Sequence, residues 1–237
     1  MQNNQILFVQ NYDIAGPGLL EAILKEKRIN YSIIHLEAGD TLPADSNFSA
    51  VVVLGGRDSA NDQTDKITSQ LTWIRQVITS GTPYLGICLG LQLGVKAMGG
   101  NVIRNPIKEV GFRSPDGELT QVAISQKGRQ DRIFGGLADI LHVFESHEDA
   151  VEPTNNMQLL AEGKYCKPQV VKIGERAYGT QFHFELTPDM FELWYRKNPN
   201  FEDMDIGKQR EDYATLKDEY EVTSHQIFTN FLSIAGI

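Results

Sequence analysis

The stretch that decides the fold is residues 83–92, Pro83-Tyr84-Leu85-Gly86-Ile87-Cys88-Leu89-Gly90-Leu91-Gln92. The short apolar run at residues 84–87 predicts a buried strand, and residues 90–98 predict a helix that stops at the pair Gly99-Gly100. Cys88 therefore lies on the turn between strand and helix. Gly-x-Cys-x-Gly has the layout of the Gly-x-Ser-x-Gly nucleophile elbow, in which a sharp turn lifts a reactive side chain above a parallel sheet.

Two interpretations of Cys88 follow from this stretch alone. At a helix N-terminus, free backbone N–H groups and the helix dipole favour the thiolate over the thiol, which is what a nucleophile needs. Cysteine is also among the most buried residue types, so Cys88 is equally well explained as a structural cysteine in a βα unit. Evidence from elsewhere in the chain has to separate the two.

The segments before this stretch predict an α/β sheet. Apolar runs at residues 6–10, 31–36 and 50–54 predict strands, and the last run has the continuous apolar character of a strand buried on both faces. Residues 65–79 carry apolar side chains at helical spacing behind Asp65, which we predict to be the helix cap. Alternating strands and helices predict a mostly parallel central sheet with helices on both sides.

After Gly100 the pattern changes to short strands and then to helices. The strand candidates predict an antiparallel extension of the sheet and lie at residues 101–104, 118–124, 140–144, 157–161, 169–173 and 177–182. A helical section of about residues 187–237 follows, in which residues 187–197 form a helix and residues 198–221 are charged and solvent-facing. The final helix presents Ile227, Phe228, Phe231 and Leu232 on one face. We expect residues 1–237 to form one domain.

Composition excludes several classes of protein. The formal net charge of −9 argues against a general nucleic-acid surface, because phosphate binding needs clustered Lys and Arg. The two cysteines, Cys88 and Cys166, favour a reducing compartment over a disulfide framework. No apolar run approaches the roughly 20 residues of a membrane span, and residues 1–5 lack the features of a signal peptide. We predict a cytoplasmic protein without nucleic-acid or membrane partners.

A cysteine nucleophile needs a base, and the base needs an orienting partner. Of the five histidines, His35, His142 and His225 have the sequence context of structural or surface residues. His183 stands at the end of a predicted strand, and residues two apart in an extended segment point the same way. His183 and Glu185 are therefore predicted to project together beyond that strand, although His-x-Glu alone is a weak motif.

The combination of the two motifs is much more specific than either one. Gly-Ile-Cys-Leu-Gly-Leu-Gln at residues 86–92, together with Gly-Thr-Gln-Phe-His-Phe-Glu at residues 179–185, resembles the class I (triad) glutamine amidotransferases. The resemblance covers about residues 6–188 and favours Cys88 as a nucleophile. Further blocks resemble that family in the expected order: Gly55-Gly56 with Arg57-Asp58-Ser59 (its oxyanion loop), Glu109-Val110-Gly111, residues 143–149, and Gln169.

This resemblance implies a flavodoxin-like three-layer sandwich and a Cys-His-Glu catalytic triad. Cys88 would attack the side-chain amide carbon of glutamine, His183 would move protons, and Glu185 would orient His183. The backbone N–H groups of Gly56 and Leu89 would bind the oxyanion of the tetrahedral intermediate.

The resemblance also implies the substrate contacts. Gln92, one turn into the helix after Cys88, matches a family glutamine that contacts the substrate, with a plain helix-surface position as the alternative. Gly55 and Ser146 are the other predicted substrate-binding residues. We expect neither a cofactor nor a metal site.

The chain departs from the family pattern at two positions. Arg57 stands where many members have proline after the two glycines, so the loop is expected to be less rigid. Phe184 replaces the frequent proline between the histidine and the glutamate. His147 and Asp149 lie in a matching block, and we assign them local hydrogen bonding rather than catalysis.

Several functions fit these observations. The sequence most resembles stand-alone members related to the amidotransferase domain of GMP synthase, and no phosphate-cradling loop is present. We therefore predict a glutaminase that supplies ammonia to a synthase partner. The alternative is a free-standing hydrolase of γ-glutamyl compounds, and a less favoured one is a non-catalytic binding or regulatory relative. A thiol esterase is disfavoured, because Glu185 follows His183 instead of preceding it.

Overall fold

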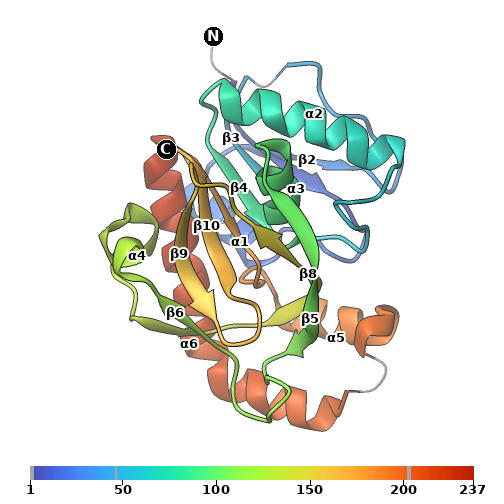
Figure 1. Cartoon of the computed structure of the whole chain (residues 1–237), viewed down its shortest axis with the longest axis vertical. Coiled ribbons are helices and arrows are strands. Elements are labelled where there is room, and N and C mark those ends of the chain that lie inside the picture. Colours follow the sequence, from blue (N-terminus) through green and yellow to red (C-terminus); the bar gives the residue numbers. More distant parts are fainter. Residues whose placement is uncertain (1–2, 46, 202–203) are drawn as a thin grey trace.

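A nine-stranded sheet runs through the centre of the molecule (Figure 1). The computed structural model describes residues 3–45, 47–201 and 204–237. Five neighbouring strands, in the order β2-β1-β3-β4-β11, run parallel. Their bounds are Asn3–Gln10 (β1), Tyr31–His35 (β2), Phe48–Val53 (β3), Tyr84–Ile87 (β4) and Ala177–Thr180 (β11).

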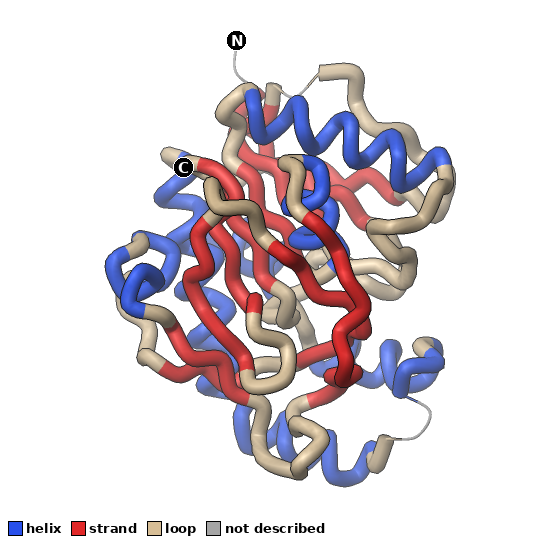
Figure 2. The backbone as a smooth tube through the Cα atoms, in the orientation of Figure 1, coloured by secondary structure: helices blue, strands red, loops and turns tan. Residues whose placement is uncertain are grey.

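The parallel strands are buried on both faces, as β1 illustrates. Ile6 and Phe8 pack into the core beneath helices α1 and α6, whereas Leu7 and Val9 pack into the core beneath α2 and α3. Successive strand residues point to opposite faces, so a continuous apolar run needs helices on both sides. This arrangement confirms the predicted flavodoxin-like sandwich (Figure 2). The helices are Leu19–Lys27 (α1), Asp65–Thr79 (α2), Leu89–Ala97 (α3) and Ile206–Ala235 (α6).

The antiparallel extension continues the sheet from β11. Strand β11 pairs antiparallel with β10, and β9, β6 and β7 follow in the same manner. These strands span Pro168–Gly174 (β10), Gln158–Gly163 (β9), Gln121–Ile124 (β6) and Ile140–His142 (β7), and between β6 and β7 lie the short helices Gln126–Gln130 (α4) and Arg132–Phe134 (η1).

A separate two-stranded sheet corrects the sequence prediction. Strand β5 runs over Asn101–Gly111, well beyond the predicted residues 101–104, and pairs antiparallel with β8, Glu145–Glu152, which was not predicted as a strand. Strand β8 carries no apolar alternation, because the side chains it buries at its start belong to Glu145 and His147. A strand that buries polar residues gives no hydrophobic period to detect.

The prediction of a solvent-facing section at residues 198–221 is wrong. After α5 (Pro188–Lys197) and the short helix η2 (Pro199–Phe201), most of that section belongs to the long helix α6, and residues 202 and 203 lie outside the described residues. Tyr213 and Tyr220 of α6 are buried in a third core with Phe112 and Phe144. The charged residues occupy one face of a helix whose other face is aromatic.

The residue that caps helix α2 differs from the prediction by one position. The hydroxyl of Thr64, rather than Asp65, accepts the N–H of Ile67 at 3.3 Å, and Thr187 caps α5 in the same way. Among the described residues, none of the helices combines the length and the apolar character that crossing a membrane requires.

Candidate active site

Cys88 occupies the sharp turn between β4 and α3. Its φ of 51° is a left-handed conformation that a side chain makes unfavourable, and its N–H donates to the carbonyl of Thr180 at 2.7 Å. The flanking glycines are needed for close approach. A Cβ at Gly86 would lie 2.4 Å from the carbonyl oxygen of Gly90, and a Cβ at Gly90 would lie 2.0 Å from the carbonyl oxygen of Val53. The strained turn is therefore built into the packing of strand against helix.

His183 and Glu185 follow directly after β11, the strand beside β4. The Nδ1 atom of His183 lies 2.6 Å from Oε1 of Glu185, and both side chains are buried. The second carboxylate oxygen accepts the N–H of Phe184 at 2.9 Å. Proline has no N–H, so the departure at Phe184 supplies a hydrogen bond that the usual family residue cannot make.

Helix α6 holds this segment in place. The hydroxyl of Tyr220 donates to the carbonyl of His183 at 3.1 Å and accepts the N–H of Leu186 at 3.2 Å. The ring of Trp194 meets the imidazole edge to face, with the centroids 4.9 Å apart. The predicted C-terminal section thus reaches the candidate site through two buried aromatic residues.

Electrostatics couple Cys88, His183 and Glu185. Burial alone would lower the pKa of His183, but the charge of Glu185 and the hydrogen bonds to Cys88 and Glu185 raise that pKa well above its ordinary value. The thiol, the imidazole and the carboxylate therefore form one connected group, in the order that nucleophilic catalysis requires.

The glycine pair lies against this group. A Cβ at Gly55 would lie 2.8 Å from Cε1 of His183, and a Cβ at Gly56 would lie 2.9 Å from Cδ2 of Leu89. The side chain of Asn11 donates to the carbonyl of Leu54 at 3.0 Å and so fixes the start of the loop. Gly56 thus lies against Leu89, the residue that follows Cys88, and the assignment of their N–H groups to an oxyanion hole stays a prediction.

Arg57, the other departure, is anchored through its side chain. Its guanidinium pairs with Glu37 at 2.7 Å and lies over the ring of Tyr12, 5.2 Å from the centroid. The loop after the glycine pair is held by an ion pair and a cation–π contact.

Gln92 is buried and does not sit on an open helix surface. Its Nε2 donates to the amide oxygen of Gln181 at 3.2 Å and to the carbonyl of Asp149 at 3.4 Å. The amide nitrogen of Gln181 in turn lies 3.5 Å from the sulfur of Cys88. Gln181 was missed as a site residue, although it stands within the motif at residues 179–185.

Two cavities border Cys88, and both are lined in part by Gly56, Arg57 and Ser146. The first has a volume of about 40 Å³, and its apolar wall consists of Tyr12, Ile14, Ala15 and Trp194, with Gly55 and His183 at the reactive end. The second has a volume of about 130 Å³ and a charged wall that comprises Asp58, Arg104, Glu148 and Asp149, and Gln92 also lines it. The predicted substrate residues Gln92, Gly55 and Ser146 all line one or both cavities.

The remaining histidines fall outside this group. His142 contacts Glu219 at 2.9 Å on the surface, and His147 bonds through Nδ1 to the carbonyl of Asp149 at 3.1 Å. The hydrogen-bonding role predicted for His147 is present, but its other nitrogen faces a buried acidic cluster that the sequence did not reveal.

Comparison with known proteins places the chain among proteins of related sequence and fold. The family model for "Glutamine amidotransferase class-I" matches residues 18–198. The glutamine amidotransferase-like protein YfeJ of Salmonella typhimurium is 28% identical over 77% of this chain and 75% of its own. One subunit of the glutamine-hydrolysing GMP synthase of Saccharolobus solfataricus is 31% identical over 59% of this chain and 68% of its own.

Solved structures agree in fold. A glutamine amidotransferase from Methylobacillus flagellatus superposes with a TM-score of 0.86 at 22% identity, covering 98% of this chain and 95% of its own. A glutamine amidotransferase from Thermotoga maritima superposes with a TM-score of 0.86 at 21% identity, covering 98% of this chain and 99% of its own.

Proposed function

The chain belongs to the class I glutamine amidotransferase family, and we propose that it hydrolyses the side-chain amide of glutamine through a thioester on Cys88. The observation that carries this proposal is the convergence of Cys88, His183 and Glu185 at the carboxyl ends of neighbouring parallel strands, where open α/β sheets bind ligands.

The first half-reaction forms the thioester. The sulfur of Cys88 attacks the amide carbon while its proton passes to Nε2 of His183, since Nδ1 is engaged by Glu185. The carbonyl oxygen becomes an oxyanion that the N–H groups of Gly56 and Leu89 would stabilise. Collapse breaks the C–N bond, and the proton on His183 goes to the departing nitrogen, which leaves as ammonia.

The second half-reaction releases glutamate. Water gives one proton to His183 and attacks the thioester carbon, and the C–S bond then breaks as His183 returns a proton to the sulfur. Throughout, Glu185 keeps the imidazole in one tautomer and stabilises its protonated form.

The test is glutamate release by the purified protein from glutamine, with Cys88→Ala as the inactive control. Turnover that Cys88→Ala abolishes supports the proposal. Turnover retained in Cys88→Ala would overturn it. No turnover, combined with labelling of Cys88 by a glutamine-mimicking electrophile, would indicate a glutaminase that needs its synthase partner, as the relatives among GMP synthases suggest. An unreactive Cys88 would favour a non-catalytic relative.

A second candidate function rests on the apolar cavity. The charged cavity suits the α-amino and α-carboxylate groups of a glutamyl moiety, whereas Tyr12, Ile14 and Trp194 line the other cavity that borders Cys88. Ammonia needs no apolar wall, but an apolar amine leaving group would gain from burial there. We therefore propose hydrolysis of γ-glutamyl amides of apolar amines as the alternative activity.

Substrate competition separates the two candidates. An apolar γ-glutamyl amide with a kcat/KM above that of glutamine would favour the alternative, and Trp194→Ala would then reduce that ratio. Equal or lower kcat/KM for the amide, with no response of the ratio to Trp194→Ala, would favour glutamine.

A further inference from the structure

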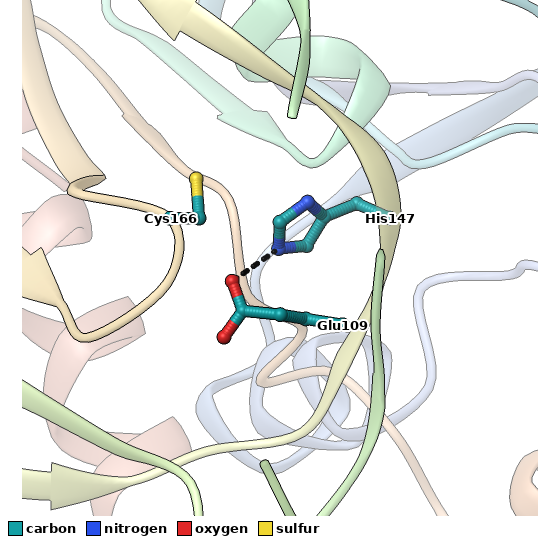
Figure 3. A group of neighbouring side chains, drawn as sticks. All are labelled: Glu109, His147 and Cys166. Carbon is teal, nitrogen blue, oxygen red and sulfur yellow. Dashed lines mark ion pairs between the residues drawn. The ribbon is translucent and has the colours of Figure 1, made fainter. Parts of the chain in front are cut away.

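A second cluster of reactive side chains lies in the interior and plays no part in the mechanism above. Glu109 comes from β5, Glu145 and His147 come from β8, and Cys166 comes from the loop between β9 and β10. Glu109 faces His147 in the register of the two-stranded sheet. One ligand atom from each of Glu109, His147 and Cys166 lies within 4.8 Å of the other two, and Figure 3 shows Glu109 and His147 facing each other beside Cys166.

Geometry brings both carboxylates to one imidazole nitrogen. Nε2 of His147 lies 3.1 Å from an oxygen of Glu145 and 3.6 Å from an oxygen of Glu109. All four residues of the cluster are buried, with 4% exposure or less. Both carboxylate oxygens of Glu145, one of Glu109 and Nε2 of His147 lack any hydrogen bond of normal geometry.

The charges of this cluster do not balance. Two carboxylates face the one imidazole of His147, so at most one positive charge stands against two negative ones. Unpaired buried charges are costly, and each unsatisfied polar atom adds to that cost. A divalent cation between the carboxylates and the imidazole would give a partner to Nε2 and to one oxygen of each carboxylate.

The ligand types point to zinc. The N–H at Nδ1 of His147 donates to the carbonyl of Asp149 at 3.1 Å, which leaves the lone pair of Nε2 directed at the cluster, as in many zinc-bound histidines. Glu109, His147 and Cys166 bring an oxygen, a nitrogen and a sulfur within 4.8 Å of one another, and Glu145, 3.1 Å from Nε2 of His147, can supply the fourth ligand. A thiolate disfavours magnesium and calcium. Tetrahedral ligands about 2.0–2.3 Å from zinc lie about 3.3–3.8 Å apart, close to the separations at Nε2.

We propose that Glu109, Glu145, His147 and Cys166 bind a single zinc ion in a closed, structural site. Binding would displace the thiol proton of Cys166, whose sulfur otherwise lies 3.7 Å from the carbonyl of Pro168, and any proton held by the carboxylates. Sequence patterns do not predict this site, because its ligands come from three separate segments at no motif spacing.

Two measurements on the whole protein test the site. After dialysis against zinc and then buffer, elemental analysis should find about one zinc ion per chain in the wild type and in Cys88→Ala, which removes the other thiol. Cys166→Ser and Glu109→Gln should bind zinc at least about 100-fold more weakly. Cobalt in place of zinc should give a thiolate charge-transfer band that persists in Cys88→Ala and disappears in Cys166→Ser.

Thermal melts distinguish a variant that has lost zinc binding from one that has misfolded. Zinc should raise the melting temperature of the wild type, and EDTA should reverse that rise. Glu109→Gln removes a buried charge, so in EDTA it should melt at or above the wild type, yet it should not respond to zinc. Zinc content equal in wild type and Cys166→Ser, or a wild type that binds no zinc, would overturn the proposal and leave a proton-sharing carboxyl pair. Neither readout depends on the hydrolytic activity.

Discussion

The molecule contains two groups built from the same residue types, and they differ in almost everything else. Cys88, His183 and Glu185 stand at the ends of parallel strands and border two cavities. Cys166 and His147, with Glu109 and Glu145, are enclosed between the two-stranded sheet and the β9–β10 loop. In the first group the imidazole has one carboxylate at 2.6 Å, whereas in the second it is shared by two at longer distances.

The difference shows that backbone placement, rather than residue type, sets the chemistry. Cys88 has a positive φ, caps a helix and touches an imidazole. Cys166 is fully buried, and burial followed by the charges of Glu145 and Glu109 raises the pKa of its thiol strongly. A thiol in that setting is inert as a nucleophile and reacts only when something positive replaces its proton. The two groups lie close together at Ser146, which stands between Glu145 and His147 in the chain and whose carbonyl oxygen lies 3.7 Å from the sulfur of Cys88.

The largest expected effect is on hydrolysis. Cys88→Ala and His183→Gln should each lower kcat/KM by about 10⁴-fold or more, because members of a nucleophile–base pair act as a unit. His142→Gln, at a surface histidine paired with Glu219, is the matched control and should stay near wild type. Comparable losses in His142→Gln would remove the basis for separating His183 from the other histidines.

Glu185→Gln should lower kcat by about 10²–10⁴-fold while the fold persists. Glutamine keeps the size of the side chain but loses the charge that stabilises protonated His183, and its amide can stabilise the wrong tautomer. Steady-state kinetics, with circular dichroism to check folding, measure this. A loss below about tenfold would mean that Glu185 is a structural partner, like the carboxylates around His147.

Labelling compares the two thiols directly. Iodoacetamide should modify Cys88 at least about 100-fold faster than Cys166 in the native protein, because Cys88 borders a cavity and hydrogen-bonds to His183, whereas Cys166 is fully buried. Peptide mass spectrometry gives both rates in one sample, and unfolding in denaturant should bring them close together. Equal native rates would contradict the enclosure of Cys166.

The first group was predictable because its residues lie in two sequence motifs whose combination resembles a known family, although neither motif is specific alone. Cys88 is framed by two glycines at an apolar strand end, and His183 and Glu185 share a face by the period of a strand. The second group was not predictable, because Glu145 and His147 turn inward on a strand with no apolar alternation, and Cys166 reaches them from a loop. The aromatic face of α6 was not predicted either, because charged residues surround Tyr213 and Tyr220 in the sequence. Local patterns report burial of apolar residues and miss burial of polar ones.

The smallest expected effect concerns an ion pair between two segments, one next to each group. Arg113, just beyond the strand that carries Glu109, makes two hydrogen bonds of 2.6 and 2.7 Å to Asp212 of α6, the helix that holds His183 through Tyr220. The hydrogen bonds from Arg113 lower the pKa of Asp212, with a smaller contribution from Lys208. Asp212→Asn should therefore lower the melting temperature at neutral pH by a few degrees.

The pH dependence of that difference follows from the sign of the pKa shift. A carboxylate whose pKa is lower in the folded state stabilises the fold above its unfolded pKa of about 4, and this stabilisation is lost as pH falls through the folded value. Melting curves of wild type and Asp212→Asn should thus converge in acid, while hydrolysis and zinc binding well below the melting temperature remain alike in both. A difference that stays constant with pH would show that Asp212 acts through packing, and a selective loss of hydrolysis would show that α6 serves the catalytic group alone.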